Sequence, residues 1–175
     1  MEVLMRDIRK AIRDIPDFPK QGIIFKDITP LLKNPKLFKK VINTFAKKYK
    51  NRGVTAIAAI ESRGFIFGAA LALKLGIPFI PVRKKGKLPY KTISATYALE
   101  YGTDTIQMHE DAITSNDKVL ILDDLAATGG TAKATAELIE KVGAKVAGFA
   151  FVIELAFLNP RQKLAGYDFY SLLQF

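Results

Sequence analysis

The sequence predicts an α/β domain with a mostly parallel central sheet flanked by helices. An unbroken apolar run at 119–122 is typical of a strand that is buried on both faces of a parallel sheet. The order strand, helix, strand over residues 54–82, with turns of only a few residues, indicates a right-handed parallel crossover. A helical pattern at 133–142 and a long apolar strand at 145–155 continue the same alternation.

Length and composition fit one domain. The chain has 175 residues, of which 49% are hydrophobic, so it can form a real core but leaves no room for a sizeable second domain. We therefore expect a single domain over residues 1–175. No apolar run is long enough to cross a bilayer, and the charged stretch 1–14 lacks the apolar centre of a signal peptide. We expect a cytoplasmic protein without a membrane partner.

The strongly basic balance admits two interpretations. A net charge of +10 suits a nucleic-acid-binding protein or a cleft that attracts small polyanions. The lysines are scattered except for one dense cluster at 83–91, and scattered lysines usually form a solvated surface. We therefore expect no nucleic-acid partner. The absence of cysteine excludes disulfides, thiolate metal sites and cysteine nucleophiles.

The N-terminal third combines two helical patterns with an irregular segment. Residues 2–15 place apolar side chains at helical spacing, and residues 35–50 do the same. Between them, residues 15–30 contain prolines and a glycine that interrupt regular structure, yet the segment is rich in Ile and Phe. An apolar loop of this kind either packs as a cap or lines a ligand pocket.

The middle of the chain supplies the crossover and a possible lid. A strand at 54–60 ends in Glu61-Ser62-Arg63-Gly64, a helix at 65–75 follows, and the next strand covers 77–82. Residues 83–102 are basic and weakly patterned, and irregular length inside a compact domain is usually functional or disordered. The single histidine, His109, receives no role, and a terminal strand is expected at 169–173.

The stretch after the apolar run at 119–122 predicts an anion site. Asp123 and Asp124 are followed by a loop of small and hydroxyl residues, 126–131, and then by a helix. Glycines let backbone N–H groups approach a phosphate, and a helix N-terminus adds its positive dipole end. Carboxylates beside a phosphate need another ligand, such as sugar hydroxyls or a cation, so a ribose 5-phosphate fits. The loop is neither a Walker A motif nor a dinucleotide fingerprint.

A second polar turn, at Glu61, is expected close to the acidic turn at Asp123. The carboxyl ends of parallel strands share one crevice, so the turns at Glu61 and Asp123 face the same ligand. Arg63 in the first turn offers a planar, permanently charged fork for an anion.

Residues 119–131 resemble the phosphoribosyl-pyrophosphate signature of the type I phosphoribosyltransferases. The resemblance implies that family's fold, with a base-binding hood (about 1–34) and a flexible lid loop (about 83–104). It assigns ribose hydroxyls to Asp123 and Asp124 and the 5-phosphate to the loop that follows. The implied phosphoribosyl-binding residues are Asp123, Asp124, Ala126, Ala127, Thr128, Gly129, Gly130 and Thr131.

Two further segments resemble the same family. Glu61-Ser62-Arg63-Gly64 is similar to its pyrophosphate loop, in which the family has a cis peptide that would fall between Glu61 and Ser62. The segments 83–89 and 97–102 resemble the lid of the adenine-specific branch. The implied pyrophosphate-binding residues are Glu61, Ser62, Arg63, Arg83 and Lys87; the implied catalytic residue is Glu100, next to Tyr101 in the lid.

The segment 15–30 resembles the hood of the adenine-specific branch. By that match Phe25 stacks on the purine ring, and the backbone of Ile24 and Lys26 hydrogen-bonds its edge. The resemblance implies a reaction of purine salvage in which adenine and phosphoribosyl pyrophosphate give AMP and pyrophosphate. It also implies Mg²⁺ bound mainly through substrate and water, with no direct protein side-chain ligand, and a homodimer.

Two alternatives remain open at this point. One is a phosphoribosyltransferase for another purine, namely hypoxanthine, guanine or xanthine. The other is a non-catalytic regulatory protein that keeps the phosphoribosyl site but binds nucleic acid. The first is disfavoured by the segment around Phe25, and the second by the lack of a helix-turn-helix pattern before residue 15.

Overall fold

The computed structural model describes residues 2–98 and 102–175. Glu100 and Tyr101, predicted as the catalytic and lid residues, lie outside this part of the chain. The chain divides into two compact units, Met1–Thr44 and Phe45–Phe175. No helix among the described residues is long and apolar enough to cross a membrane.

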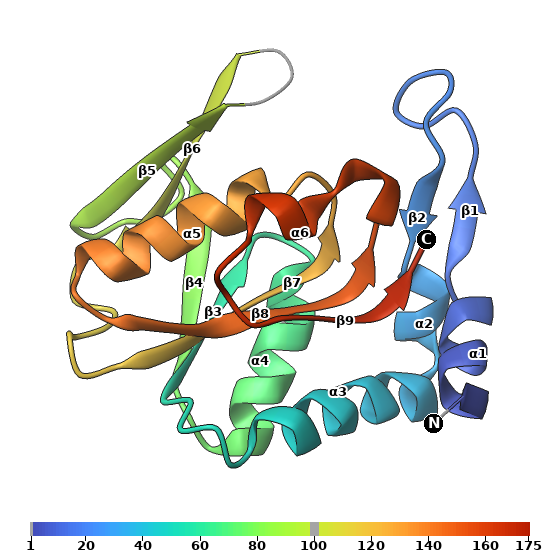
Figure 1. Cartoon of the computed structure of the whole chain (residues 1–175), viewed down its shortest axis with the longest axis horizontal. Coiled ribbons are helices and arrows are strands. Elements are labelled where there is room, and N and C mark those ends of the chain that lie inside the picture. Colours follow the sequence, from blue (N-terminus) through green and yellow to red (C-terminus); the bar gives the residue numbers. More distant parts are fainter. Residues whose placement is uncertain (1, 99–101) are drawn as a thin grey trace. The chain divides into compact units, whose positions relative to one another are not determined.

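The first unit contains short elements (Figure 1). They are the helices α1 (Glu2–Lys10) and α2 (Thr29–Lys33), the strands β1 (Arg13–Ile15) and β2 (Phe25–Asp27), and most of helix α3 (Pro35–Tyr49). The strands form an antiparallel pair, in which Arg13 contacts Asp27 at 2.6 Å. The helix predicted over 2–15 therefore ends earlier, at Lys10, because the residues after it enter this strand pair.

The second unit is built on a seven-stranded sheet with the strand order β5-β6-β4-β3-β7-β8-β9. Strands β4, β3, β7, β8 and β9 are mutually parallel, and β6 and β5 extend the sheet antiparallel at one edge. The strands are β3 (Ala56–Ile60), β4 (Phe79–Lys84), β5 (Thr92–Ala98), β6 (Thr103–His109), β7 (Lys118–Ala126), β8 (Lys145–Glu154) and β9 (Phe169–Gln174). The helices are α4 (Gly64–Leu75), α5 (Gly130–Lys141), the 3-10 turn η1 (Ala156–Leu158) and α6 (Pro160–Lys163). This is the mostly parallel sheet flanked by helices that the sequence predicted.

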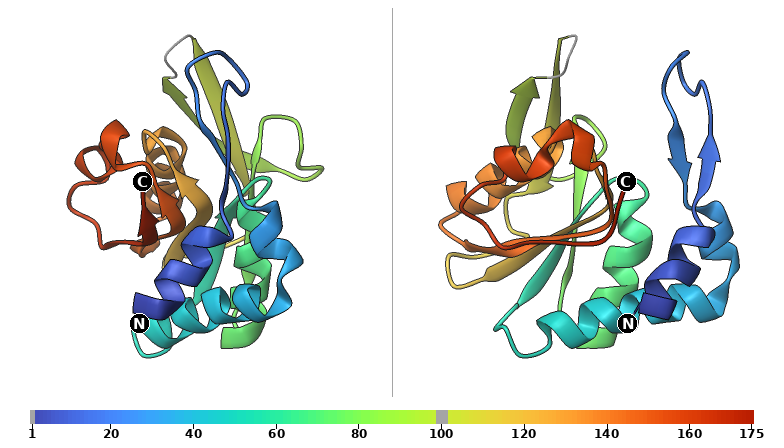
Figure 2. Two further views of the ribbon diagram at one scale, coloured as in Figure 1. Left: turned by 90° about the vertical axis from the view of Figure 1, so that its right-hand side faces the viewer. Right: turned by 45° about the vertical axis from the view of Figure 1, so that its right-hand side comes forward.

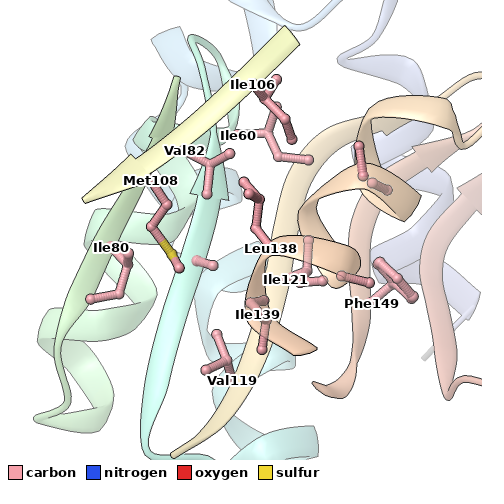
Figure 3. Close-up of a cluster of buried hydrophobic side chains, with 14 of the residues drawn as sticks. Ile60, Ile80, Val82, Ile106, Met108, Val119, Ile121, Leu138, Ile139 and Phe149 are labelled. Atoms are coloured by element: carbon pink, nitrogen blue, oxygen red, sulfur yellow. The ribbon is translucent and has the colours of Figure 1, made fainter. Parts of the chain in front are cut away.

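Strand β3 is buried over its whole length because helices cover both faces of the sheet. Alternate residues of β3, among them Ala58 and Ile60, join Leu138 and Ile139 of α5 in one apolar cluster (Figure 3). Ala59 points the other way and lies under α4 at Gly68, where there is no space for a larger side chain. Burial on both faces explains the unbroken apolar runs in the sequence.

The weakly patterned segment after β4 forms an antiparallel hairpin. Strands β5 and β6 pair over their whole lengths, and the hairpin projects from the edge of the sheet (Figures 1 and 2). Ile93, Ala95 and Tyr97 of β5 pack against the apolar cluster, while Ser94 and Thr96 between them are exposed. This period of two is the signature of a half-buried strand, so the expected lid segment contains a regular strand over residues 92–98.

Candidate functional site

A small cavity lies at the carboxyl end of β7. Its volume is about 90 Å³, and it is lined by Asp123, Leu125, Ala126, Ala127, Thr128, Gly129, Gly130, Thr131, Ala132 and Phe151. All the predicted phosphoribosyl-binding residues except Asp124 therefore line one cavity. Strand β7 continues through both aspartates to Ala126, whose carbonyl oxygen accepts a hydrogen bond from Leu155 N at 2.9 Å. The aspartates thus lie within the strand, not after its end as the sequence suggested.

The floor of the cavity is the start of α5. Gly129 is the N-cap of this helix and has a φ of 81°, a left-handed conformation that glycine adopts without strain. Because glycine has no side chain that could cap the first turn, the amides of that turn can bind an anion. The twelve-residue helix adds its positive dipole end at the same place. The loop thus has the chemistry of a phosphate site.

The acidic pair is held by a residue from another turn. Arg63 Nε lies 3.0 Å from Oδ2 of Asp124, whose side chain is 5% exposed. Oδ2 accepts no hydrogen bond from any described residue, so its contact with Arg63 is an ion pair. Asp123 Oδ1 accepts a hydrogen bond from the backbone N of Asp124 at 2.8 Å.

Both carboxyl groups of the pair are harder to ionise than an exposed aspartate. Burial raises the pKa of Asp123 well above its ordinary value, and the negative charge of Asp124 raises it further. Burial also raises the pKa of Asp124, but the positive charge of Arg63 opposes this change. Groups that donate hydrogen bonds to the pair, such as sugar hydroxyls, would relieve the cost of holding two carboxylates together.

The predicted pyrophosphate-binding residues gather beside the pair. The turn at Glu61, Ser62 and Arg63 connects β3 with α4, and the peptide bond between Glu61 and Ser62 is cis. Arg83 Nε, at the end of β4, lies 2.6 Å from Glu61 Oε2, and its Nη1 donates to the carbonyl oxygen of Lys87 at 2.9 Å. The Lys87 side chain is exposed. Arg83 thus joins the end of β4 to the turn that carries Arg63.

The predicted adenine-binding residues belong to the first unit. Ile24 is 55% exposed, and the rings of Phe25 and Phe18 meet edge to face with centroids 5.2 Å apart. Lys26 Nζ lies 2.7 Å from Asp14 Oδ1. Lys26 therefore already has an ionic partner within its own unit, which agrees with a role of its backbone in base recognition.

The sequence analysis missed Tyr97 as a neighbour of the site. Its phenol oxygen lies 3.1 Å from the hydroxyl oxygen of Thr131, a residue that lines the cavity. The alternation of β5 could have revealed that Tyr97 faces inward, but nothing in the sequence pairs β5 with the start of α5.

Comparisons with known proteins place this site in a family. The model of the phosphoribosyl transferase domain matches residues 27–169. The adenine phosphoribosyltransferase of Solidesulfovibrio magneticus is 55% identical over 168 residues, which cover 96% of this chain and 98% of that protein.

Solved structures agree with the sequence relatives. The crystal structure of the adenine phosphoribosyltransferase of Thermoanaerobacter pseudethanolicus superposes with a TM-score of 0.95 at 53% identity and covers 98% of this chain and 99% of that chain. The Saccharomyces cerevisiae enzyme, crystallised with an imino-altritol bisphosphate and adenine, gives a TM-score of 0.93 at 40% identity, with coverage of 99% and 100%. This chain belongs to the adenine phosphoribosyltransferases, as the matched domain, the identity over nearly its whole length and the shared fold show.

Proposed function

We propose that this protein transfers the 5-phosphoribosyl group of phosphoribosyl pyrophosphate to adenine, giving AMP and pyrophosphate. The observation that supports this most is the cavity at the end of β7, where a phosphate loop lies beside an acidic pair of which Asp124 is buried. A phosphate alone would not need the acids, and a sugar alone would not need the loop. The yeast relative was crystallised with adenine and a sugar-like bisphosphate, which agrees with both halves of the proposal.

Each part of the substrate has a proposed contact. The loop from Ala126 to Thr131 holds the 5-phosphate through backbone amides and hydroxyls. Asp123 and Asp124 accept hydrogen bonds from the ribose hydroxyls, and their charge stabilises the cationic character that the sugar develops as the leaving group departs.

The pyrophosphate is assigned to the cationic side of the site. Arg63 and Arg83 are permanently charged, and the Lys87 side chain is exposed. The amides of the turn at Glu61 and Ser62 add neutral donors. Together these groups stabilise the negative charge that builds on the departing pyrophosphate.

The purine is assigned to the first unit and to the catalytic residue predicted from the resemblance. Phe25 stacks on adenine, and the backbone of Ile24 and Lys26 hydrogen-bonds its edge. Glu100, beside Tyr101, handles the proton balance at N7 while N9 attacks the sugar carbon, and the C–O bond to pyrophosphate breaks. The remaining task of the protein is to position two substrates and exclude water.

The acidic pair fits Mg²⁺ in its chemistry but not as a complete site. Carboxylate oxygens are the ligands that Mg²⁺ prefers, yet no group of three or more His, Asp or Glu side chains among residues 2–98 and 102–175 is placed to hold a metal ion. We propose that substrate oxygens and water hold Mg²⁺, as the family resemblance implies. When bound, Mg²⁺ neutralises charge on the pyrophosphate.

The family resemblance also supports proposals about the oligomeric state, the location and the domain organisation of the protein. We infer a homodimer, a cytoplasmic location, and one functional domain in which residues 1–34 form the hood and 83–104 the lid. Sedimentation of the purified protein at micromolar concentration measures the first of these directly, since a monomer and a dimer of this chain differ twofold in mass.

The activity is tested by incubating the protein with adenine, phosphoribosyl pyrophosphate and Mg²⁺ and measuring AMP. Parallel reactions with hypoxanthine, guanine and xanthine separate adenine transfer from transfer to another purine. Asp124→Asn protein, purified in the same way, controls for a contaminating host enzyme, and a reaction with excess chelator controls for the metal. AMP formation that is equal in the wild type and this variant would contradict the proposal.

A gel shift at physiological salt tests the remaining alternative. A regulatory protein that binds nucleic acid would retard DNA or RNA, and it would need no catalytic residue. We expect no shift, because the basic residues outside the cluster at 83–91 are scattered and no helix-turn-helix pattern precedes residue 15.

A further inference from the structure

Tyr97 connects the phosphate loop to the hairpin β5–β6. Thr131, the second residue of α5, donates a hydrogen bond from its hydroxyl to the phenol oxygen of Tyr97 over 3.1 Å. The contact joins residues 34 positions apart in the chain. It reaches a residue that lines the cavity, from an element that does not itself line it.

The ring of Tyr97 also packs against the start of the helix. A methyl group added at Gly130 would stand 3.4 Å from Cδ2 of Tyr97 and 3.8 Å from the carbonyl oxygen of Ala98. The ring is half-buried and packs on the apolar cluster of the sheet. The packing of the ring therefore fixes the position of the Tyr97 hydroxyl beside Thr131.

Beyond Tyr97 the hydrogen bonds continue across the hairpin. The Tyr97 hydroxyl donates to Oδ2 of Asp104, its cross-strand neighbour, over 3.4 Å. Asp104 has two closer partners, Lys84 Nζ at 3.1 Å and the backbone N of Thr105 at 2.8 Å. Loss of the long bond from Tyr97 would leave Asp104 well satisfied.

A bound phosphate changes what these hydroxyls can do. A threonine hydroxyl has one hydrogen to donate and two lone pairs, and a phosphate dianion can only accept. When Thr131 donates to a phosphate, it can no longer donate to Tyr97. Its oxygen is then free to accept the Tyr97 hydrogen, which the weak 3.4 Å bond to Asp104 releases readily.

We propose that Tyr97 is a positioning residue for the phosphate loop. In the free protein it accepts the hydrogen of Thr131, and when a phosphate is bound it donates to Thr131 and fixes that hydroxyl toward the ligand. The hairpin thereby responds to occupancy of the loop, because the Tyr97 hydrogen leaves Asp104 and the existing bond between Tyr97 and Thr131 reverses its direction. This inference rests on the proposed function, since it takes the 5-phosphate as the ligand of the loop.

The first test is Tyr97→Phe, which removes the hydroxyl and keeps the packed ring. We expect the KM for phosphoribosyl pyrophosphate to rise by about 3- to 10-fold, the loss expected for one hydrogen bond, with kcat within about twofold of wild type. The KM for adenine should not change. A general loss of structure would lower kcat as well, so the split between the two constants separates positioning from damage.

Tyr167→Phe is the matched control. The Tyr167 hydroxyl also contacts α5, accepting from Lys133 Nζ at 3.2 Å and donating to Glu140 at 2.7 Å, and neither of these partners lines the cavity. This variant should keep the wild-type KM for phosphoribosyl pyrophosphate. Equal KM increases in both variants would overturn the assignment of Tyr97.

A double-mutant cycle and a binding measurement complete the test. Because Tyr97 acts through Thr131, adding Tyr97→Phe to Thr131→Val should not raise the KM further, whereas additive effects would overturn the proposal. Hydrogen exchange of residues 92–98 should change when saturating ribose 5-phosphate binds the wild type, but not when it binds Tyr97→Phe.

The outcomes separate this proposal from the function on which it rests. If wild-type protein binds neither ribose 5-phosphate nor phosphoribosyl pyrophosphate, both are overturned. If wild type binds them and Tyr97→Phe binds equally well with the same exchange pattern, only the role of Tyr97 is overturned. Should Tyr97→Phe fail to fold, the exchange measurement is made on Thr131→Val at saturating ligand, and a wild-type response there overturns the proposal.

Discussion

Gly64 lies directly against Asp123. A methyl group at Gly64 would stand 2.7 Å from Oδ1 of Asp123 and 3.1 Å from its Cα. The first residue of α4 therefore fixes how the turn that contains Arg63 approaches the acidic pair. A side chain at this position must displace either the carboxylate or the helix.

Gly64→Ala should weaken the binding of phosphoribosyl pyrophosphate. The added methyl group overpacks the contact, so we expect a loss of about 1–3 kcal/mol in the free energy of unfolding together with displacement of Asp123. The dissociation constant, measured by titration calorimetry, should rise by about tenfold or more, as expected when a charged hydrogen-bonding group is misplaced.

Gly68→Ala is the control for this prediction. It introduces a methyl group one turn later in α4, against the side chain of Ala59, and neither carboxylate is among the atoms nearest to that methyl group. It should destabilise the fold to a similar extent but leave the dissociation constant within about twofold of wild type. If the two variants lose affinity equally, the contact with Asp123 is not the cause.

Asp123→Asn should stabilise the protein at neutral pH while it impairs activity. Burial and the neighbouring charge of Asp124 raise the pKa of Asp123 in the folded state above its unfolded value. The folded state therefore binds the proton more tightly, and stability is lost as the pH rises through the raised pKa. Asparagine can still accept the bond from the backbone of Asp124 and has no charge to bury.

The expected gain at pH 7 is about 0.5–2 kcal/mol in the free energy of unfolding, as is common when a functional constraint is relieved. It should vanish at a pH below about 3.9, where the unfolded aspartate is itself protonated. Urea unfolding at several pH values measures the gain in unfolding free energy at pH 7 and its disappearance in acid. A variant that is less stable than wild type at pH 7 would contradict the prediction.

Most of the parallel sheet was predictable because burial on two faces leaves an apolar run in the sequence. The runs at 119–122 and 145–155 became β7 and β8 for this reason. The acidic pair seemed to end β7, but Leu125 and Ala126 pair onward with β8, so neighbouring strands and not composition set its end. The β5–β6 hairpin was missed because small and hydroxyl residues give a faint alternation.

The site was predictable in its residues but not in its contacts. The loop 126–131 and the acidic pair are contiguous in sequence, and their chemistry follows from residue type. The pairing of Arg63 with Asp124 and of Tyr97 with Thr131 depends on which strand ends and edges the fold brings together. One sequence contains no direct signal for such long-range pairs.

Glu100→Ala should lower kcat by about two to four powers of ten, the usual contribution of a general acid–base residue. The affinity for phosphoribosyl pyrophosphate should stay near that of wild type, since the proposed role of Glu100 is at the purine. Initial rates of AMP formation and calorimetric titration measure the two effects. Glu110→Ala, which removes an exposed acid further along the chain, is the control and should keep wild-type rates. Unchanged turnover in Glu100→Ala would remove this residue from the mechanism.

Glu154→Gln should destabilise the carboxyl end of β8. The Glu154 side chain is 2% exposed and accepts hydrogen bonds from Arg161 at 2.7 and 2.8 Å, from Ser171 at 2.6 Å and from Gln174 at 3.1 Å. Replacing this buried carboxylate, whose Arg161 partner is half exposed, should lower the free energy of unfolding at pH 7 by about 1–3 kcal/mol. Glu110→Gln, at an exposed pair with Lys91 of 4.0 Å, should change it by less than about 1 kcal/mol.

The pH dependence of that loss follows from the sign of the pKa shift. Burial alone would raise the pKa of Glu154, but the hydrogen bonds from Arg161, Ser171 and Gln174 hold it below the ordinary value. The unfolded chain then binds the proton more tightly, so the stabilisation is complete above the unfolded pKa of about 4.3 and disappears as the pH falls through the folded pKa. The difference in unfolding free energy between wild type and Glu154→Gln should therefore shrink in acid. An equal difference at pH 7 and pH 3 would mean that Glu154 contributes through packing and not through its charge.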